Sequence, residues 1–397
     1  GAPGRHGAGS ARGAPVPEGV MSLRVLSDEG LENIATHKYK PGLYTPLDNI
    51  LNPFWTRMTG YLPIWFAPNL VTFSGFLPMV LTYSMVLYNV PDYTTAPPRW
   101  LALLACMSLW FYQTMDAMDG KQARRTKAST PMGQLFDHGC DCLGCLTLHA
   151  VAGMVLLTGP THDTLFGLTI FQTGFFFAQW QEHYTGTLYT AYGPVGVTEA
   201  QYGLISAALI AFIAGPDTVE AIAKTQLSLP IAGEMTCGAL GIRLWALFVT
   251  GLITTSTVGT VPDAKKAGRL VRSMVDLIPV IVLNLLSYSW HPAVVATSMR
   301  LILLNTGLLF FFLTAQMILF SMARLEFPIF QPCLLPYGVM VAASRVAPGQ
   351  QELLTGMMLL CSLVYMVWVF GWNVIVIQEL KRKLNINIFS IPVLPQD

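Results

Sequence analysis

Long apolar runs, separated by short polar stretches, make up most of this chain after residue 68. A helix needs about 20 mostly apolar residues to cross the hydrocarbon core of a bilayer. One of the runs is short and contains Pro336, but the others approach or exceed that length. We therefore predict an all-α fold, a polytopic membrane bundle of about ten transmembrane helices. The runs lie at residues 69–90, 100–119, 135–158, 163–185, 198–215, 236–258, 271–289, 293–321, 331–346 and 353–379.

The stretch before the first apolar run divides in two. Residues 1–20 are rich in Gly, Ala and Pro without periodicity, and we expect residues 1–35 to be a disordered or tag-derived N-terminus. Residues 36–68 mix large apolar residues with a few polar ones, which favours an interfacial segment whose helix, near residues 46–63, lies on the bilayer. We expect a functional core at 69–215, further transmembrane helices at 216–380 and a cytosolic tail at 381–397.

The amino-acid composition is typical of a membrane protein and excludes several other classes of protein. Hydrophobic residues make up 53% of the chain and charged residues 11%, whereas an ordinary soluble domain carries about 25% charged residues. The formal net charge is +1, so no overall field attracts a polyanion. We therefore exclude a soluble enzyme, a disordered protein and a nucleic-acid-binding protein.

Basic residues between the runs predict the orientation of the bundle. Loops that carry an excess of Lys and Arg stay on the cytosolic side of a membrane. Three such clusters are separated by even numbers of runs, so we expect them, both termini and the functional site on the cytosolic side. The clusters are Lys121, Arg124, Arg125 and Lys127; Lys265, Lys266, Arg269 and Arg272; and Lys381, Arg382 and Lys383.

Four carboxylates flank the first basic loop. Asp116 and Asp119 are three residues apart, Asp137 and Asp141 are four apart, and residues at these spacings share one face of a helix. Two adjacent helices can therefore direct all four at one point. Such acids repel one another and need cations, and two Mg²⁺ ions would balance their charge and bridge substrate phosphates.

The residues around these acids suit a metal–diphosphate site. Lys121, Arg124 and Arg125 add positive charge, and Gly120, Ala123 and Gly133 are small enough for close approach of a ligand. The alternative interpretation is that the acids cap helix ends and pair with the nearby Lys and Arg.

The segment that carries the acids, DAMDGKQARRTKASTPMGQLFDHGCD at residues 116–141, resembles the signature of the CDP-alcohol phosphotransferases. That signature reads D-x-x-D-G-x-x-A-R, eight residues, then G-x-x-x-D-x-x-x-D, and every spacing is kept. APNLVTFSG (67–75), WQEHYTGTL (180–188) and, more weakly, LNINIF (384–389) are similar to the eukaryotic choline- and ethanolaminephosphotransferase branch. The resemblance implies transfer of phosphocholine or phosphoethanolamine from CDP-choline or CDP-ethanolamine to diacylglycerol, giving phosphatidylcholine or phosphatidylethanolamine and CMP.

The resemblance also implies roles for individual residues. It implies Mg²⁺, or Mn²⁺ in its place, held by the four Asp residues, and a homodimer in the endoplasmic reticulum or Golgi membrane. Asn69 and Arg124 would contact the CDP group. His138 would be the proton acceptor, with Asp141 as the second choice. The family usually has Glu where this chain has Gln134. We expect the side-chain carbonyl of Gln134 to orient the His138 ring, which is one helical turn away.

A cationic headgroup calls for aromatic rings and a carboxylate. Trp180, Glu182, Tyr184 and Glu199 lie at the expected cytosolic ends of two apolar runs and are candidates for it, although Trp and Tyr also line membrane interfaces routinely. Two other functions stay open. One is a CDP-diacylglycerol-dependent enzyme such as a phosphatidylinositol synthase, and the other is a cation transporter that uses the four acids as an ion site.

Overall fold

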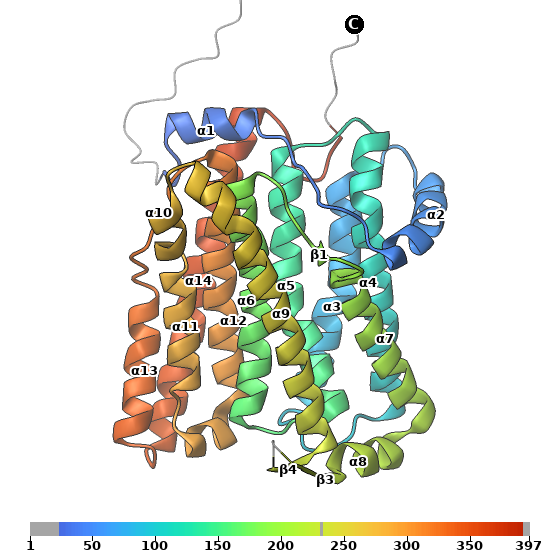
Figure 1. The fold of residues 1–397 in the computed structure, drawn as a ribbon, viewed down its shortest axis with the longest axis vertical. Coiled ribbons are helices and arrows are strands. Elements are labelled where there is room, and N and C mark those ends of the chain that lie inside the picture. The colour runs from blue at the N-terminus through green and yellow to red at the C-terminus, as the bar shows by residue number, and fades with distance from the viewer. Residues whose placement is uncertain (1–23, 231–232, 392–397) are drawn as a thin grey trace, which may run out of the picture.

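The computed structural model describes residues 24–230 and 233–391, and within them the chain is almost entirely helical (Figure 1). Two short antiparallel hairpins, β1 (Ala191–Tyr192) with β2 (Val195–Gly196) and β3 (Gln226–Leu229) with β4 (Gly233–Thr236), join helices. The helices are α1 (Asp28–Ala35), α2 (Pro46–Tyr61), α3 (Pro68–Asn89), α4 (Arg99–Arg125), α5 (Pro131–Leu156), α6 (His162–Thr185), α7 (Val197–Ala214), α8 (Pro216–Lys224), α9 (Cys237–Lys266), α10 (Leu270–Val275), α11 (Ile278–Tyr288), α12 (Pro292–Ala323), α13 (Leu334–Val346) and α14 (Gln351–Leu384).

Each apolar run coincides with a helix of the bundle, the run at 271–289 with the pair α10 and α11. Among the described residues, seven spans are long and apolar enough to cross a membrane: α3, α5, α7, α9, the α10–α11 pair, α12 and α14. The chain is thus a polytopic membrane protein. The helices α4 and α6 carry more polar residues, and α13 has only 13 residues.

The expectation for the N-terminus is partly wrong. Residues 1–20 lie outside the described part of the chain, but α1 forms inside the 1–35 segment that we expected to be disordered. Ser27 caps α1 by accepting a hydrogen bond from the Gly30 N–H at 3.1 Å. The helix is held in place because the Asn33 amide donates to the Ala323 carbonyl at 2.9 Å. Tertiary contacts with the end of α12 therefore order a segment that has no apolar run of its own.

The predicted helix near residues 46–63 is present as α2. Thr45 and Asp48 form a capping box at its start, and Pro46 occupies the first helical position, where a missing N–H costs nothing. One face buries Trp55 against the bundle, while Ile50 and Tyr61 remain exposed. These exposed side chains at one end of the bundle suit a helix that lies in a membrane interface (Figure 1).

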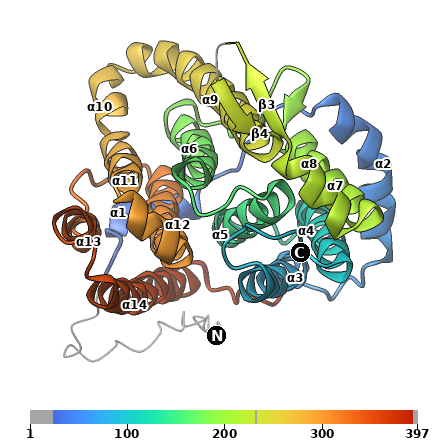
Figure 2. The same ribbon diagram turned by 90° about the horizontal axis from the view of Figure 1, so that it is seen from below.

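Helices α5 and α12 form the interior of the bundle. In the most apolar 18-residue stretch of each helix, 83% of the residues are buried in α12 and 67% in α5, but only 28% in α14 and 22% in α9. Figure 2 shows α5, α6 and α12 surrounded by the other helices. Outer helices that are apolar all round are the expected result when the surrounding solvent is lipid.

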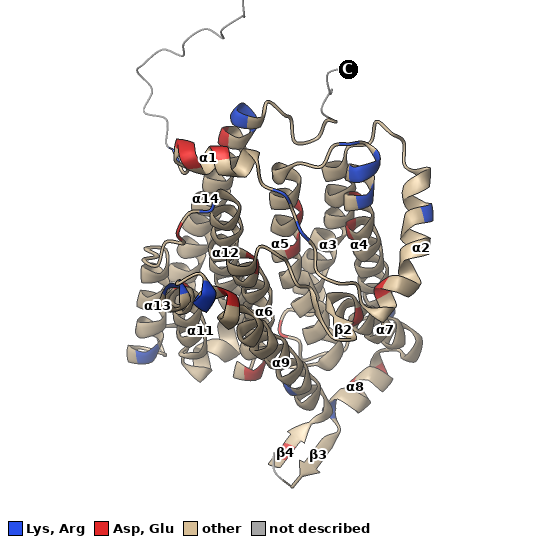
Figure 3. Cartoon of the chain, turned by 45° about the horizontal axis from the view of Figure 1, so that its top comes forward, with Lys and Arg blue, Asp and Glu red and all other residues tan. Residues whose placement is uncertain are grey.

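The basic clusters come together at one end of the bundle, as the sequence predicts. The turn after α4, the segment around α10 and the last turn of α14 all lie at the end that carries α1 and α2 (Figure 1). Figure 3 shows Lys and Arg at the end of α4 and acidic residues further inside, on α4 and α5.

Close helix packing generates a stability prediction. A Cβ added at Gly238, near the start of α9, would lie 1.8 Å from the backbone oxygen of Leu156, whereas one at Gly251 on the same helix would meet nothing within 4 Å. We expect Gly238→Ala to lower the unfolding free energy by about 1–3 kcal/mol, because backbone must move. Gly251→Ala is the matched control and should leave it unchanged or slightly raised. Thermal unfolding in detergent measures both, and equal midpoints would contradict this packing.

Candidate active site

The turn between α4 and α5 brings the acidic residues of the two helices together. Helix α4 ends at Arg125, and Lys127 adopts a left-handed conformation with φ of 54° that reverses the chain. Thr130 then caps α5 by accepting a hydrogen bond from the Gly133 N–H at 3.1 Å. Asp119 is six residues before the end of α4 and Asp137 six residues after the start of α5, about 9 Å from each helix end.

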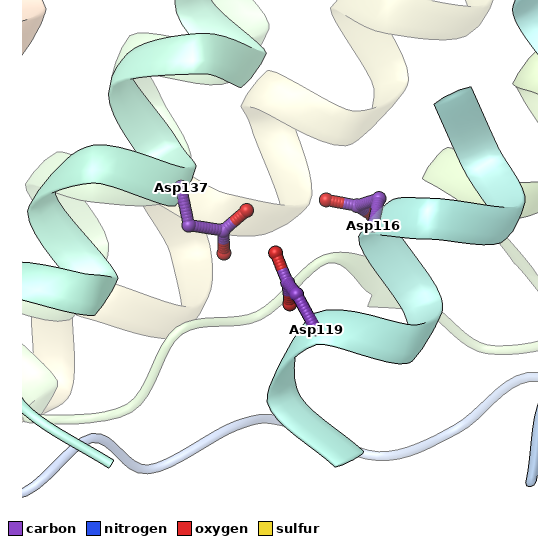
Figure 4. A group of neighbouring side chains, drawn as sticks. All are labelled: Asp116, Asp119 and Asp137. Carbon is purple, nitrogen blue, oxygen red and sulfur yellow. The ribbon is translucent and has the colours of Figure 1, made fainter. Parts of the chain in front are cut away.

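Three of the four predicted acids form a compact cluster. One carboxylate oxygen each from Asp116, Asp119 and Asp137 lies within 4.8 Å of the others, and Figure 4 shows the three side chains pointing toward one another. The Thr72 hydroxyl donates to Asp119 Oδ2 at 2.5 Å. Buried Asp137 Oδ1 has no hydrogen-bond partner among the described residues.

This carboxylate triad fits a hard divalent cation. Such ions prefer carboxylate oxygens, and an unpartnered buried oxygen is a donor still available to one. The alternative interpretation, in which the acids pair with nearby basic residues, does not hold for the triad. Within the described residues its only ion-pair contact is from His138 Nε2 to Asp137 Oδ2 at 3.9 Å, and no Lys or Arg is that close.

Asp141 lies outside the triad. Its Oδ1 accepts a hydrogen bond from the hydroxyl of Tyr112, a buried residue of α4. Both side chains line the same cavity as the triad. The structure thus brings the fourth acid to the site but gives it a protein partner of its own.

His138 is buried beside the triad, with 4% of its surface exposed. Its Nδ1 atom has no hydrogen-bond partner among the described residues. The ring of Tyr39, from the segment between α1 and α2, packs edge-on at a centroid distance of 5.7 Å. The imidazole therefore lies at the site with one ring nitrogen unpaired.

The role expected of Gln134 is wrong. Its carbonyl accepts a hydrogen bond from His37 Nε2 at 2.8 Å, and its amide donates to Glu182 Oε1 at 3.0 Å. Both ends of the side chain are thus occupied away from His138. Burial lowers the pKa of His37, and its Nε2 is the donor in this bond because the Gln134 carbonyl oxygen can only accept. Gln134 fastens the segment before α2 to α5 and α6 instead of orienting His138.

A large cavity extends from the acids between apolar helices of the bundle. It has a volume of about 780 Å³ and is lined near the triad by polar side chains and farther away by apolar ones. Both Asp137 and Leu156 line it, and these residues are nineteen positions apart on α5, about 28 Å along the helix axis. The apolar part is lined by residues of α5, α6, α7 and α9, among them Val155, Phe171, Phe175, Leu204, Trp245 and Val249.

The basic residues of the signature divide between two roles. Lys121 and Arg124 line the cavity together with Gly120, and the Lys121 ammonium donates to the Asn52 side chain. Arg125 does not line it, because its guanidinium donates to the Thr59 and Leu62 carbonyls at 3.0 and 2.7 Å. Arg125 thus anchors the end of α2, and its contact with the nucleotide stays a prediction.

Three further predicted contacts lie off the cavity wall. Ala123 and Gly133 do not line it among the described residues. Neither does Asn69, whose amide donates to the Ile388 carbonyl at 2.8 Å. A Cβ added at Gly133 would lie 3.5 Å from Asn69 Oδ1, so these two residues adjoin. The oxygen and the second amide hydrogen of Asn69 remain for the nucleotide contact that the family implies.

Most of the predicted headgroup site is also wrong. Trp180 is fully buried and donates to the Ser273 carbonyl at 2.8 Å, and the Tyr184 hydroxyl donates to Asp276 Oδ2 at 2.5 Å. Together with Glu182, which accepts from Gln134, they lie outside the described cavity wall. Glu199 lines the cavity, and its buried Oε1 has no hydrogen-bond partner among the described residues.

Several residues that line the cavity were not predicted from the sequence. Tyr189 and Tyr192, whose rings stack at 6.4 Å, come from the hairpin before α7 and line the cavity with Glu199. The only sequence signal was a concentration of Tyr in TLYTAYGPVG (187–196). Tyr39 and Tyr112 gave no signal, because one precedes the bundle and the other lies inside an apolar run.

Comparison with known proteins supports one family. Residues 65–216 match the CDP-alcohol phosphatidyltransferase family. The chain is 32% identical over 304 residues to choline/ethanolaminephosphotransferase 1 of Arabidopsis thaliana, covering 72% of this chain and 76% of that protein. It is 34% identical to cholinephosphotransferase 1 of Rattus norvegicus over 52% of both chains. Ethanolaminephosphotransferase 1 of Mus musculus is 27% identical over 94% of this chain and 96% of its own.

The matched region coincides with the helices that build the site. Residues 65–216 comprise α3 to α7, which supply the carboxylate triad, Asp141, His138 and Glu199. The relatives extend the similarity to most of the remaining chain. With the signature spacing kept and its acids gathered at one point, the chain belongs to the CDP-alcohol phosphatidyltransferase family.

Proposed function

We propose that this chain transfers phosphocholine or phosphoethanolamine from the CDP-alcohol to the hydroxyl of diacylglycerol, giving phosphatidylcholine or phosphatidylethanolamine and CMP. The observation that carries the proposal is a carboxylate triad at the polar end of a cavity whose other end is apolar. A water-soluble nucleotide and a lipid can meet only where both environments adjoin. The named activities of the relatives support the same reaction.

The triad, with Asp141 beside it, would hold two Mg²⁺ ions, or Mn²⁺ in their place. Such a cation supplies positive charge that polarises the diphosphate and offsets the charge that develops on the leaving CMP. The protein holds Asp119 in position through Thr72. Lys121 and Arg124, on the cavity wall next to the triad, bind the phosphate oxygens.

His138 is the proposed proton acceptor. As the acceptor hydroxyl oxygen bonds to the phosphorus of the phosphoaminoalcohol, the bond to the CMP oxygen breaks and the hydroxyl proton passes to an imidazole nitrogen. Asp141 remains the second choice, but its carboxylate already accepts a hydrogen bond from Tyr112. An acceptor that is already hydrogen-bonded is the weaker base.

Glu199 with Tyr189 and Tyr192 is the proposed site for the cationic headgroup. These residues line the cavity, and the unpaired Glu199 Oε1 offers a negative partner. Tyrosine rings attract ammonium groups through the negative faces of their π systems. The set replaces Trp180 and Tyr184, whose polar atoms are bound elsewhere.

The apolar part of the cavity is the proposed site for the acyl chains. The whole cavity, from the triad to Leu156, extends along α5 for about 28 Å, close to the hydrocarbon thickness of about 30 Å. Helices α7 and α9 supply facing walls, including Ala207 and Trp245, and we propose that diacylglycerol enters from the bilayer between them.

The proposal also includes the topology of the chain in its membrane. We count α4, α6 and α13 with the seven apolar spans, which gives ten crossings and leaves both termini and the site on the cytosolic side. The basic clusters at that end support this orientation. The endoplasmic reticulum or Golgi membrane and a homodimer, both implied by the family, stay predictions.

Two alternative functions would use different substrates. A phosphatidylinositol synthase would use CDP-diacylglycerol and inositol, and a cation transporter would move Mg²⁺ without releasing CMP. Purified protein in liposomes, given CDP-choline or CDP-ethanolamine with diacylglycerol, CDP-diacylglycerol with inositol, or Mg²⁺ alone, separates them. We expect CMP release in the first arms only, and their relative rates give the headgroup preference.

Metal dependence follows from the triad. We expect Asp116→Asn, Asp119→Asn and Asp137→Asn each to lower turnover more than about 100-fold, because replacing even residues that support a metal ligand costs 10–100-fold. EDTA should abolish wild-type activity, and Mg²⁺ or Mn²⁺ should restore it. CMP release measures both. Asp163→Asn, which removes an acid paired with Arg243 at the start of α6, is the control. Near-normal turnover in two of the triad variants would refute the metal role.

The role of His138 as proton acceptor predicts a specific effect of its replacement on kcat and KM. We expect His138→Ala to lower kcat by about 10²–10⁴-fold while the KM for the CDP-alcohol stays close to wild type, because a general base acts in the transition state. Steady-state kinetics with both substrates measure the split. His162→Ala, at the far end of α6, is the matched control. An unchanged kcat in His138→Ala would pass the role to Asp141.

Filling the apolar cavity should affect the lipid substrate alone. Ala207 lines the cavity and neighbouring Ser206 is exposed. We expect Ala207→Phe to raise the KM for diacylglycerol about tenfold or more, because the ring occupies acyl-chain space. The KM for CDP-choline should not change, and Ser206→Phe should behave as wild type. A larger effect on CDP-choline than on diacylglycerol would contradict this assignment.

A further inference from the structure

The end of the chain returns to the site after the last helix. Helix α14 ends at Leu384, and Asn385 adopts a left-handed conformation with φ of 51° that turns the chain back. The segment 385–390, which we call the C-terminal hook, contains most of the LNINIF motif that the proposed function leaves without a role. It reaches the first turn of α3, where the Ile388 carbonyl accepts the hydrogen bond from Asn69 at 2.8 Å.

Phe389 contacts α5, which carries Asp137 of the triad, and α3, which supports the triad through Thr72. Its ring is 5.8 Å from the ring of Phe73 on α3 and 5.6 Å from that of Phe136 on α5, measured between centroids. The contact with Phe136 is edge-to-face, an orientation that aromatic quadrupoles favour. The hook therefore joins α3 to α5 through one aromatic side chain.

Both aromatic partners are next in sequence to residues of the triad or its support. Phe73 follows Thr72, whose hydroxyl holds Asp119, and Phe136 precedes Asp137. A shift of either helix backbone at the aromatic residue moves the neighbouring side chain with it. The contacts of Phe389 thus bear on the helix backbone next to Asp137 and next to Thr72, the support of Asp119.

The base of the hook is itself fixed. The buried Glu379 carboxylate accepts hydrogen bonds from the backbone N–H groups of Val25 and Leu26 at 2.8 and 3.1 Å. Lys383 pairs with Glu32 of α1. These contacts hold the end of α14, from which the hook begins, against α1 and the residues before it.

We propose that the C-terminal hook is a positioning element for the metal site, with Phe389 and the Ile388 carbonyl as its contacts. This inference rests on the proposed function for its kinetic part, since it assigns the hook to the CDP-alcohol side of the reaction. The acyl-chain part of the cavity lies along α5, α6, α7 and α9, and the hydrogen bond and aromatic contacts of the hook are with residues that do not line it among the described residues. The hook therefore acts on the metal and the nucleotide and not on the lipid.

The test compares Phe389→Ala with Phe389→Tyr in the full chain. Mn²⁺ binding, measured by electron paramagnetic resonance without substrates, should weaken about tenfold in Phe389→Ala, the size seen when support for a metal ligand is lost. The KM for CDP-choline should rise and the KM for diacylglycerol should not. Phe389→Tyr keeps the ring and should restore both. Phe330→Ala, an exposed phenylalanine between α12 and α13, is the matched control.

The outcomes separate this inference from the proposed function. Wild-type Mn²⁺ affinity and CDP-choline KM in Phe389→Ala would overturn the positioning role, as would an equal rise in both substrate KM values. If Phe389→Ala does not fold, Phe389→Leu is measured in the same way and should give a smaller shift in the same direction. Mn²⁺ binding needs no substrate, so a wild-type protein that binds Mn²⁺ but releases no CMP disproves the proposed function and leaves the hook testable.

Discussion

The mutual repulsion of three carboxylates held within 4.8 Å is the constraint on which the rest of the structure depends. At an effective dielectric constant of about 20, two unit charges 4 Å apart repel by about 4 kcal/mol. Nearby basic groups could relieve the repulsion, but Arg125 binds the end of α2 and Lys121 binds Asn52. The bundle thus keeps the triad assembled and leaves its charge for a metal ion to balance. Helix packing has to supply the rigidity that this requires.

The cavity offers adjoining polar and apolar environments to the proposed nucleotide and lipid substrates. Its polar end lies near the end of the bundle where the basic residues gather, and its apolar part continues along α5 as far as Leu156. In the proposed reaction, diacylglycerol would keep its chains in the apolar part while its hydroxyl reaches the triad. Trp180 and Tyr184 lie on α6 away from this cavity, and hold α10 and the start of α11 against the catalytic helices through Ser273 and Asp276.

Both ends of the described chain converge on the site from outside the family signature. The segment before α2 brings Tyr39 onto His138 and is fastened by His37 to Gln134. The hook after α14 brings Phe389 between α3 and α5. The helices after α8 contribute α9 to the cavity wall and otherwise support α5 and α6, mainly through α12. The C-terminal half therefore shapes and braces a site whose acids come from the N-terminal half.

The sequence by itself determined the membrane class, the positions of the long apolar helices and the acids of the site. Apolar runs must become helices in lipid, because an unpaired backbone group is costly there, and the i,i+3 spacing puts Asp116 and Asp119 on one helix face. Only the tertiary structure decided which side chains share the cavity. Gln134 is one turn from His138 in sequence, yet His37 and Glu182 take both ends of its amide. Helical periodicity fixes where a side chain points on its own helix, whereas its partners depend on which helices pack beside it.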